Sequence, residues 1–146
     1  MLADFPDLNG YYAEKAAWRH TTVGVGFAVN LGRSLRVPVV HQPATRSQRE
    51  IASAVRDLSL KYLRDELQVA DLTGGSFTVT DLSSQGVEHF VPVLNQRQSA
   101  ILGICAETTI GRRELVMTFD HRMSDGMRAA SFLTKLRERL EATGSA

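Results

Sequence analysis

A histidine at the end of an apolar segment is the strongest sign of chemistry in this sequence. His121 follows the run from Glu114 to Phe119, and the pair Asp125-Gly126 comes four and five residues later, where a helix is predicted to begin. The unperturbed pKa of histidine, about 6.5, lets it take up and return a proton near neutral pH. The pattern therefore indicates acid-base chemistry, whereas each residue alone would more simply be a surface histidine or a helix N-cap.

The composition limits what this histidine can serve. The chain has 146 residues, 43% of them hydrophobic and 23% charged, so we expect one domain spanning residues 1–146. A formal charge of +1 provides no net field for nucleic acid or an anionic membrane, and we expect neither as a partner. Cys105 is the only cysteine, and no Cys/His spacing is typical of a metal site, so no metal is expected. Without a signal peptide or an apolar run of ~20 residues, a cytoplasmic protein is expected.

Hydrophobic spacing predicts the elements that position the histidine. Apolar and β-branched runs predict strands at residues 21–30, 35–40, 76–80, 99–105 and 114–119. A turn at 30–33 would join the first two into a hairpin, and Pro38 points to a sheet edge or a bulge. Helices are predicted over 125–142 and from Ser47, where Glu50 completes a capping-box pattern. Thr78 and Thr80 fall on the same face of their strand.

Three ordered blocks of sequence accompany these elements. They read GGSFTVTDL at 74–82, FVPVLNQRQSAILGI at 90–104 and DHRMSDG at 120–126. Together with 23–29, 37–40 and the helix from Ser47, they resemble the catalytic domain of the dihydrolipoyl acyltransferases of 2-oxo acid dehydrogenase complexes. The resemblance covers essentially the whole chain, and it rests on three blocks at the family's spacing rather than on one short motif.

The resemblance implies both a fold and a reaction. The fold would be α/β, a chloramphenicol acetyltransferase-like mixed β-sheet with packed helices, assembled as a homotrimer or higher oligomer with active sites between subunits. The reaction would move an acyl group between the thiol of a dihydrolipoyl-lysine, supplied in trans, and coenzyme A. His121 would be the general base, Thr80 would donate a hydrogen bond to the oxyanion, and Asp125 would hold the turn and the imidazole. No residues are assigned to coenzyme A binding.

Physical chemistry is consistent with these roles. A thiol with a pKa of about 8.5 is only a few per cent ionised at pH 7, so a nearby base increases the thiolate available for attack. General-base catalysis contributes about 10²- to 10⁴-fold. A fixed hydroxyl donor to the developing oxyanion contributes on the order of 3 kcal/mol. A threonine can supply that donor, and a valine could not.

The chain departs from the family pattern in three places. Relative to the family it lacks the lipoyl and subunit-binding modules and roughly the front third of the catalytic domain, so an N-terminally truncated fold is expected. The segment from Ala3 to Ala17 would then be the tail of a lost helix and turn. Ser83 stands where the family usually has glycine, and the link from Ala106 to Arg113 is short.

Several alternatives remain open at this level. The chain could be a fragment, a natural truncation, or half of a split enzyme whose second chain supplies the absent part. Its function could be that of a catalytically reduced scaffold or assembly module. It could also transfer the acyl group to another acceptor, such as a carrier-protein pantetheine or an amine in a secondary pathway. In a eukaryote, the mitochondrial matrix would be the expected location.

Overall fold

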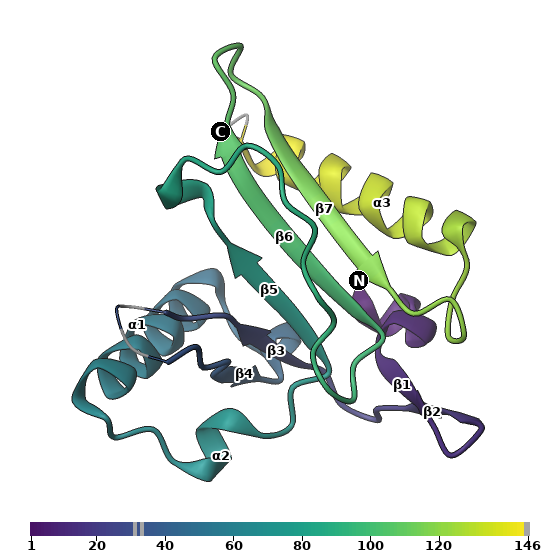
Figure 1. Cartoon of the computed structure of the whole chain (residues 1–146), viewed down its shortest axis with the longest axis horizontal. Coiled ribbons are helices and arrows are strands. Elements are labelled where there is room, and N and C mark those ends of the chain that lie inside the picture. The colour runs from purple at the N-terminus through teal and green to yellow at the C-terminus, as the bar shows by residue number, and fades with distance from the viewer. Residues whose placement is uncertain (31, 33, 145–146) are drawn as a thin grey trace.

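The centre of the molecule is a mixed β-sheet with strand order β4-β3-β5-β6-β7 (Figure 1). The computed structural model describes residues 1–30, 32 and 34–144. Its sheet strands are β3 (Gly24–Phe27), β4 (Val39–His41), β5 (Phe77–Asp81), β6 (Ala100–Glu107) and β7 (Arg113–Phe119). β5 runs parallel to β3 and to β6, whereas β4 and β7 pair antiparallel at the two edges. The predicted mixed sheet and the edge position next to Pro38 are confirmed.

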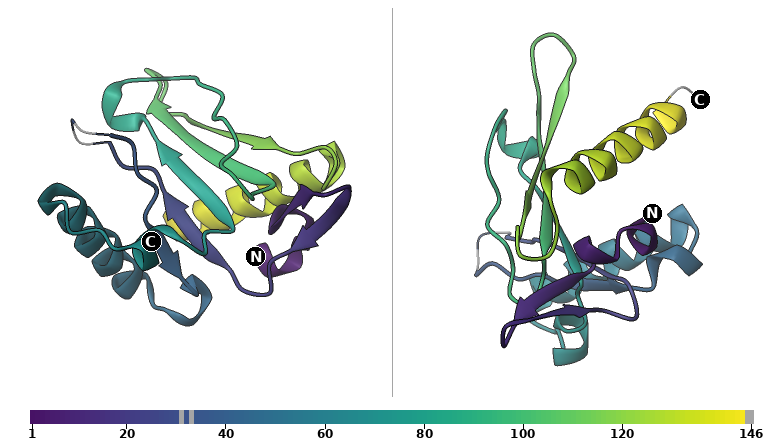
Figure 2. Two further views of the ribbon diagram at one scale, coloured as in Figure 1. Left: turned by 60° about the horizontal axis from the view of Figure 1, so that its bottom comes forward. Right: turned by 90° about the vertical axis from the view of Figure 1, so that its right-hand side faces the viewer.

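Helices cover one face of this sheet, and an irregular segment crosses the other (Figure 2). The covering helices are α1 (Gln48–Arg64) and α3 (Gly126–Gly144), and a single turn, α2 (Val69–Leu72), follows α1. Residues 87–99 run over the opposite face. Among the described residues, no helix combines the length and the apolarity needed to cross a membrane.

The start of α1 follows from its local sequence. The Glu50 amide donates to Ser47 Oγ over 3.3 Å, and the Ser47 amide donates to Glu50 Oε2 over 2.7 Å. These two bonds satisfy amides that lack partners within the first turn of a helix. The capping box predicted from the sequence is therefore confirmed, and the helix buries Leu58 and Tyr62.

The N-terminal segment is not the remnant of a helix, and that expectation was wrong. The segment begins with two 3₁₀ turns, η1 (Leu2–Asp4) and η2 (Pro6–Leu8). Phe5, between the two turns, and Leu8, at the end of η2, are almost completely buried in the core. The Phe5 ring meets the Phe132 ring of α3 edge-on at 5.4 Å. The chain then forms a separate hairpin from β1 (Gly10–Ala13) and β2 (Ala16–Arg19). The turn predicted at 30–33 includes positions 31 and 33, which lie outside the described residues.

A buried polar seam fixes this hairpin to the sheet. Asn9 Oδ1 accepts a hydrogen bond from Ser76 Oγ, and Asn9 Nδ2 donates to the His20 carbonyl over 3.2 Å. Ser99 Oγ donates to the Asp7 carbonyl over 2.8 Å. Buried polar groups of this kind are costly to leave unpaired, so the seam holds the hairpin in one position. By holding the hairpin, these bonds also position the loops beside it.

Candidate active site

His121 lies in a turn directly after β7, where its imidazole is exposed. Its ring packs against the Phe119 ring with a centroid separation of 4.5 Å. We refer to residues 120–125 as the histidine turn. The carbonyl of Asp120 accepts hydrogen bonds from the amides of Met123 and Ser124, and these bonds close the turn. His121 is therefore held at the end of a strand, as predicted, with its imidazole accessible.

An ion pair that sequence reasoning missed stabilises the histidine turn. Arg122 Nη2 lies 2.6 Å from Asp120 Oδ2, and Arg122 Nε lies 2.9 Å from Asp120 Oδ1. These hydrogen bonds hold the pKa of the Asp120 carboxyl below its usual value. The Arg122 guanidinium also lies 4.6 Å from the centre of the Tyr12 ring, which connects the turn to the hairpin. The sequence does carry a signal for this ion pair, because an acidic residue precedes the histidine and a basic residue follows it.

Asp125 is the N-cap of α3. Its Oδ1 accepts a hydrogen bond from the Arg128 amide over 2.9 Å, and its carbonyl accepts one from the Ala129 amide. Among the described residues, Asp125 makes no hydrogen bond to His121. Its role in holding the turn is thus visible in the structure, whereas contact with the imidazole is not.

Thr80 lies at the carboxyl end of β5 and faces a groove that we call the Thr80 groove. The groove has a volume of about 340 Å³, and residues between 90 and 95 form one side of it. Its lining includes Thr78, Thr80, Phe90, Pro92, Asn95 and Ile101. The two threonines share a face, as predicted, but their hydroxyls differ. Thr78 Oγ1 donates to Gln98 Oε1 over 2.7 Å, whereas the Thr80 hydroxyl makes no hydrogen bond to any residue the structure describes.

His121 and Thr80 of one chain lie at opposite ends of the sheet. Thr80 pairs with Gly103, which pairs with Val116 on β7. His121 is five residues beyond Val116. At strand geometry this amounts to roughly 15 Å along the sheet, and two strand spacings add about 10 Å across it. A single chain therefore does not bring the predicted base and the predicted oxyanion donor together.

Two other histidines, His41 and His89, have hydrogen-bond partners at the surface. His41 Nε2 contacts the Ala70 carbonyl at 3.3 Å, and His89 Nδ1 lies 2.7 Å from Glu114 Oε2. Cys105 is buried in β6. Within the described part of the chain, no three His, Cys, Asp or Glu side chains gather into a group suited to a metal ion.

The fold is that of a catalytic domain of the acyltransferase class. The family model for the catalytic domain of 2-oxoacid dehydrogenases acyltransferase matches residues 1–146. The chain belongs to this family.

Known relatives support this assignment. The dihydrolipoyllysine-residue acetyltransferase component of the acetoin cleaving system of Bacillus subtilis is 35% identical to this chain, over 96% of it. The chain spans only 38% of that relative's length. A crystal structure of a probable dihydrolipoamide acetyltransferase from Listeria monocytogenes superposes with a TM-score of 0.89 at 28% identity, and it covers 97% of this chain and 65% of its own.

Another solved relative was studied for residues of its own catalytic mechanism. The dihydrolipoamide acetyltransferase of Azotobacter vinelandii is 29% identical, with a TM-score of 0.84 over 92% of this chain and 61% of its own. That structure was studied for the role of a serine, a histidine and an asparagine in its catalytic mechanism, the asparagine lying four residues after the histidine. His121 and Asp125 have the same spacing.

Proposed function

We propose that this chain is an acyltransferase that moves an acyl group between a carrier-bound thiol of the dihydrolipoyl type and coenzyme A. In this proposal His121 of one copy is the general base, and Thr80 of a second copy donates to the oxyanion. The carrier domain arrives in trans. The active unit is therefore an oligomer of this chain, in keeping with the homotrimer implied by the resemblance.

The separation of His121 and Thr80 carries this proposal. Both side chains are accessible, and neither is held by a structural hydrogen bond that would explain its presence. A tetrahedral intermediate needs both groups within hydrogen-bond distance, about 3 Å from the reacting atoms. Because the register places them at opposite ends of the sheet, the second group must come from another copy. A closed, symmetric ring of copies supplies one such pairing at every interface.

The proposed reaction follows from the chemistry of the two groups. His121 takes the proton of the incoming thiol, and the thiolate sulfur forms a bond to the thioester carbonyl carbon. The carbonyl π electrons move to oxygen, and the Thr80 hydroxyl donates to the oxyanion. When the carbonyl re-forms, the bond to the first sulfur breaks, and that sulfur takes the proton back from the imidazolium. The same steps run in both directions between the two thiols.

The Azotobacter relative supports the assignment of these roles. The resemblance places Thr80 where the family has a serine or a threonine, and either residue supplies a hydroxyl donor. An aspartate in place of an asparagine keeps a side chain that can cap a helix, and Asp125 does cap α3. These substitutions retain the hydrogen-bonding groups that the mechanism requires.

An apolar groove indicates a further partner contact in the assembly. It has a volume of about 350 Å³ on the helix-covered face, between the N-terminal turns and α3, and its lining includes Val25, Phe77, Val79 and Leu136. In this proposal a second polypeptide supplies a segment that packs there, corresponding to parts of the relatives beyond the region this chain covers. Co-purification of a defined partner, and its loss in a Leu136→Glu variant, would support this contact. A folded Leu136→Glu chain that retains the partner would contradict it.

Mixed assembly tests the proposed function. Chains carrying His121→Ala and chains carrying Thr80→Val are co-expressed with different tags, and assemblies that contain both are isolated. If the site forms between copies of a trimer, every trimer that contains both variants keeps both groups at one of its three interfaces, and activity returns to about a third of the wild-type level. If both variants and their mixture are inactive, the shared site is wrong. A folded wild-type oligomer without acyl transfer would favour the scaffold alternative.

A further inference from the structure

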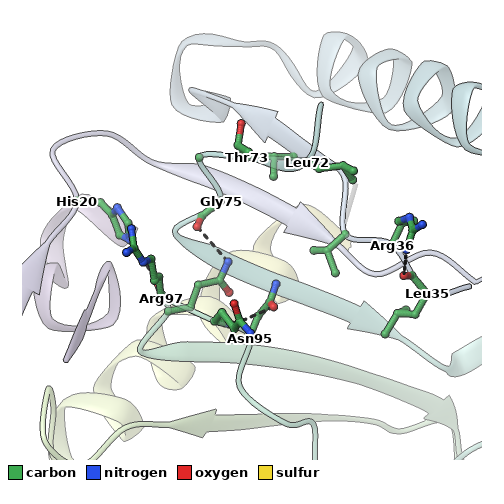
Figure 3. A pocket seen from close by; sticks show the side chains of 13 residues that line it. His20, Leu35, Arg36, Leu72, Thr73, Gly75, Asn95 and Arg97 are labelled. Carbon is green, nitrogen blue, oxygen red and sulfur yellow. Dashed lines mark hydrogen bonds between the residues drawn. The ribbon is translucent and has the colours of Figure 1, made fainter. Parts of the chain in front are cut away.

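The outer edge of β7 lies apart from the catalytic regions described above. A hollow of about 710 Å³ between the hairpin and the loop 95–98 (Figure 3) shares Leu35, Val37 and Asn95 with the Thr80 groove, so it belongs to that region. β7 forms the opposite edge of the sheet. Among the strands of the described residues, it pairs only with β6. Its outer side therefore has no strand partner within the described part of the chain.

β7 lacks the features by which proteins usually protect an edge strand. Its residues 115–119 read LVMTF, without a charge or a proline. The irregularity in its pairing with β6 lies between Ile104 and Glu107, opposite the start of β7. Charges, prolines and bulges normally keep an edge from pairing with another chain. Residues 115–119 are therefore a template on which a further strand can form.

The hydrogen bonds between β6 and β7 identify the backbone groups that face outward. The Asp120 amide donates to the Ser99 carbonyl over 2.8 Å, and this pair continues the register of the two strands. In an antiparallel ladder, residues that bond to the neighbouring strand alternate with residues that do not. Counted back from Asp120 in steps of two, Thr118 and Val116 bond to β6. The residues that direct their amides and carbonyls away from β6 are therefore Leu115, Met117 and Phe119.

The position of α3 leaves room beside β7 for an extended segment. In Figure 1 the helix runs alongside β7 on the side away from β6, and Figure 2 shows that it stands off the sheet. A second copy joined edge to edge would place its own α3 over the same two strands, where the two helices would collide. An extended segment without a covering helix avoids this collision. The hollow between β7 and α3 has a volume of about 340 Å³ and is lined by Arg113, Glu114, Leu115, Leu133, Thr134 and Arg137.

The walls of this hollow indicate the chemistry of its occupant. Leu115 and Leu133 are partly buried against the core and make the inner wall apolar. Arg113 and Arg137 also line the hollow, and the carboxylates paired with them lie 3.8 Å and 3.9 Å away. Close ion pairs with arginine are about 1 Å shorter, so both guanidinium groups can bind a further carboxylate. The occupant that matches these walls has apolar side chains on one face and an acidic residue.

We propose that the outer edge of β7 is a docking site for an extended segment of a second polypeptide, which adds a strand to the sheet beside α3. The outward amides and carbonyls of β7 supply main-chain hydrogen bonds, and alternate side chains of the segment supply specificity. Its apolar side chains face Leu115 and Leu133, and its carboxylate binds Arg113 and Arg137. This contact lies on the other side of α3 from the apolar groove lined by Leu136. It does not depend on the acyltransferase reaction.

Synthetic peptides test this docking site on the whole wild-type chain. The probes are labelled peptides of about ten residues that alternate valine and threonine, with a glutamate replacing the valine nearest one end or the other, so that both strand directions are represented. Fluorescence anisotropy should show that one of them binds. Methylation of its backbone nitrogens along the edge that faces β7 should weaken binding about tenfold or more, whereas methylation along the opposite edge, the matched control, should not. Hydrogen exchange should slow at the amides of Leu115 and Met117 when the peptide binds.

Variants of the chain test the same contact from the other side. Met117→Pro removes an outward amide and leaves the bonds of β6 in place, so it should weaken peptide binding about tenfold. Arg137→Gln should weaken it about two- to fivefold, and Arg139→Gln, on the exposed surface of α3, should not. No binding of either peptide to the folded wild type, or equal losses for both methylated forms, would overturn the proposal. So would an oligomer of the wild type whose mass falls by half in Met117→Pro, because a second copy would then occupy the edge.

Discussion

At the carboxyl end of β7, the histidine turn is closed by an ion pair and by the cap of α3, whereas at the carboxyl end of β5 the Thr80 hydroxyl faces an open groove without a partner. The two ends differ in whether the polar groups there find their partners within one chain. The first is stabilised by contacts that the chain makes with itself. In the proposed function, the second is completed by the imidazole of another copy. Substitutions of the residues that close the first end, Asp120 and Asp125, should therefore affect stability, and those at Thr80 activity alone.

The largest effect is expected from removing the imidazole. His121→Ala should lower kcat by about 10²- to 10⁴-fold, because general-base catalysis is lost. The far-UV circular dichroism and oligomer mass should not change, since the His121 side chain is exposed. His89→Ala is the matched control on the surface, and it should retain activity. Turnover by His121→Ala at the wild-type rate would rule out the proposed base.

A threonine pair tests the other end. Thr80→Val should lower kcat by about 10²-fold and leave the free energy of unfolding unchanged, because the proposed role of its hydroxyl is to donate to the transition state and it has no partner within the described fold. Thr78→Val should destabilise the fold by about 1–3 kcal/mol, because it removes the donor to the buried Gln98 amide oxygen. Kinetics and urea unfolding of both variants measure the two effects. Thr80→Ser should retain activity, and a Thr80→Val variant that is destabilised but fully active would contradict the assignment.

Much of this comparison could be predicted from the sequence, because it rests on local patterns. The strand before His121, the capping box of α1 and the shared face of Thr78 and Thr80 follow from spacing over a few residues. The hairpin β1–β2 could not be predicted. Its turn places Glu14 and Lys15 at φ of 53° and 60°, a conformation that usually requires asparagine or glycine. Long-range contacts impose this turn, so its sequence carries no turn signal.

The catalytic roles of His121, Thr80 and Asp125 stay predictions that rest on the family resemblance. The structure shows His121 exposed after its strand and Asp125 as the cap of α3. The contact of Arg122 with Tyr12 and that of His20 with Arg97 join segments far apart in the chain. These contacts depend on how the hairpin packs against the rest of the fold. Residue spacing along the sequence does not predict that packing.

A pH experiment on the Asp120–Arg122 pair should show a smaller effect. Arg122 lowers the pKa of Asp120, so the pair stabilises the fold above the unfolded pKa of about 3.9 and ceases to do so as the pH falls through the folded pKa. The wild type should therefore be more stable than Asp120→Asn at pH 7, and the difference should shrink by pH 3. Urea unfolding at several pH values measures it. A difference independent of pH would contradict the role of this carboxylate.

The smallest effect is expected at the cap of α3. Asp125→Ala should cost about 1 kcal/mol of stability, because the Arg128 amide loses its acceptor. Asp125→Asn should retain most of the stability and activity, because an amide oxygen can accept the same bond. Thermal unfolding of both variants checks this order. If Asp125→Asn lost activity while remaining folded, a negative charge beside the imidazole would be required, and the cap alone would not explain Asp125.

The depth of the Thr80 groove depends on Gly103, because this residue has no Cβ atom. A Cβ at this position would come within 2.7 Å of the Phe90 ring, so the ring lies directly on the backbone of β6. Phe90 is part of the groove wall, and Gly103 pairs with Thr80 on the neighbouring strand. Any larger residue at 103 would push the ring away from the sheet and reshape the Thr80 groove. The shape of this groove is thus subject to selection at a position outside its lining.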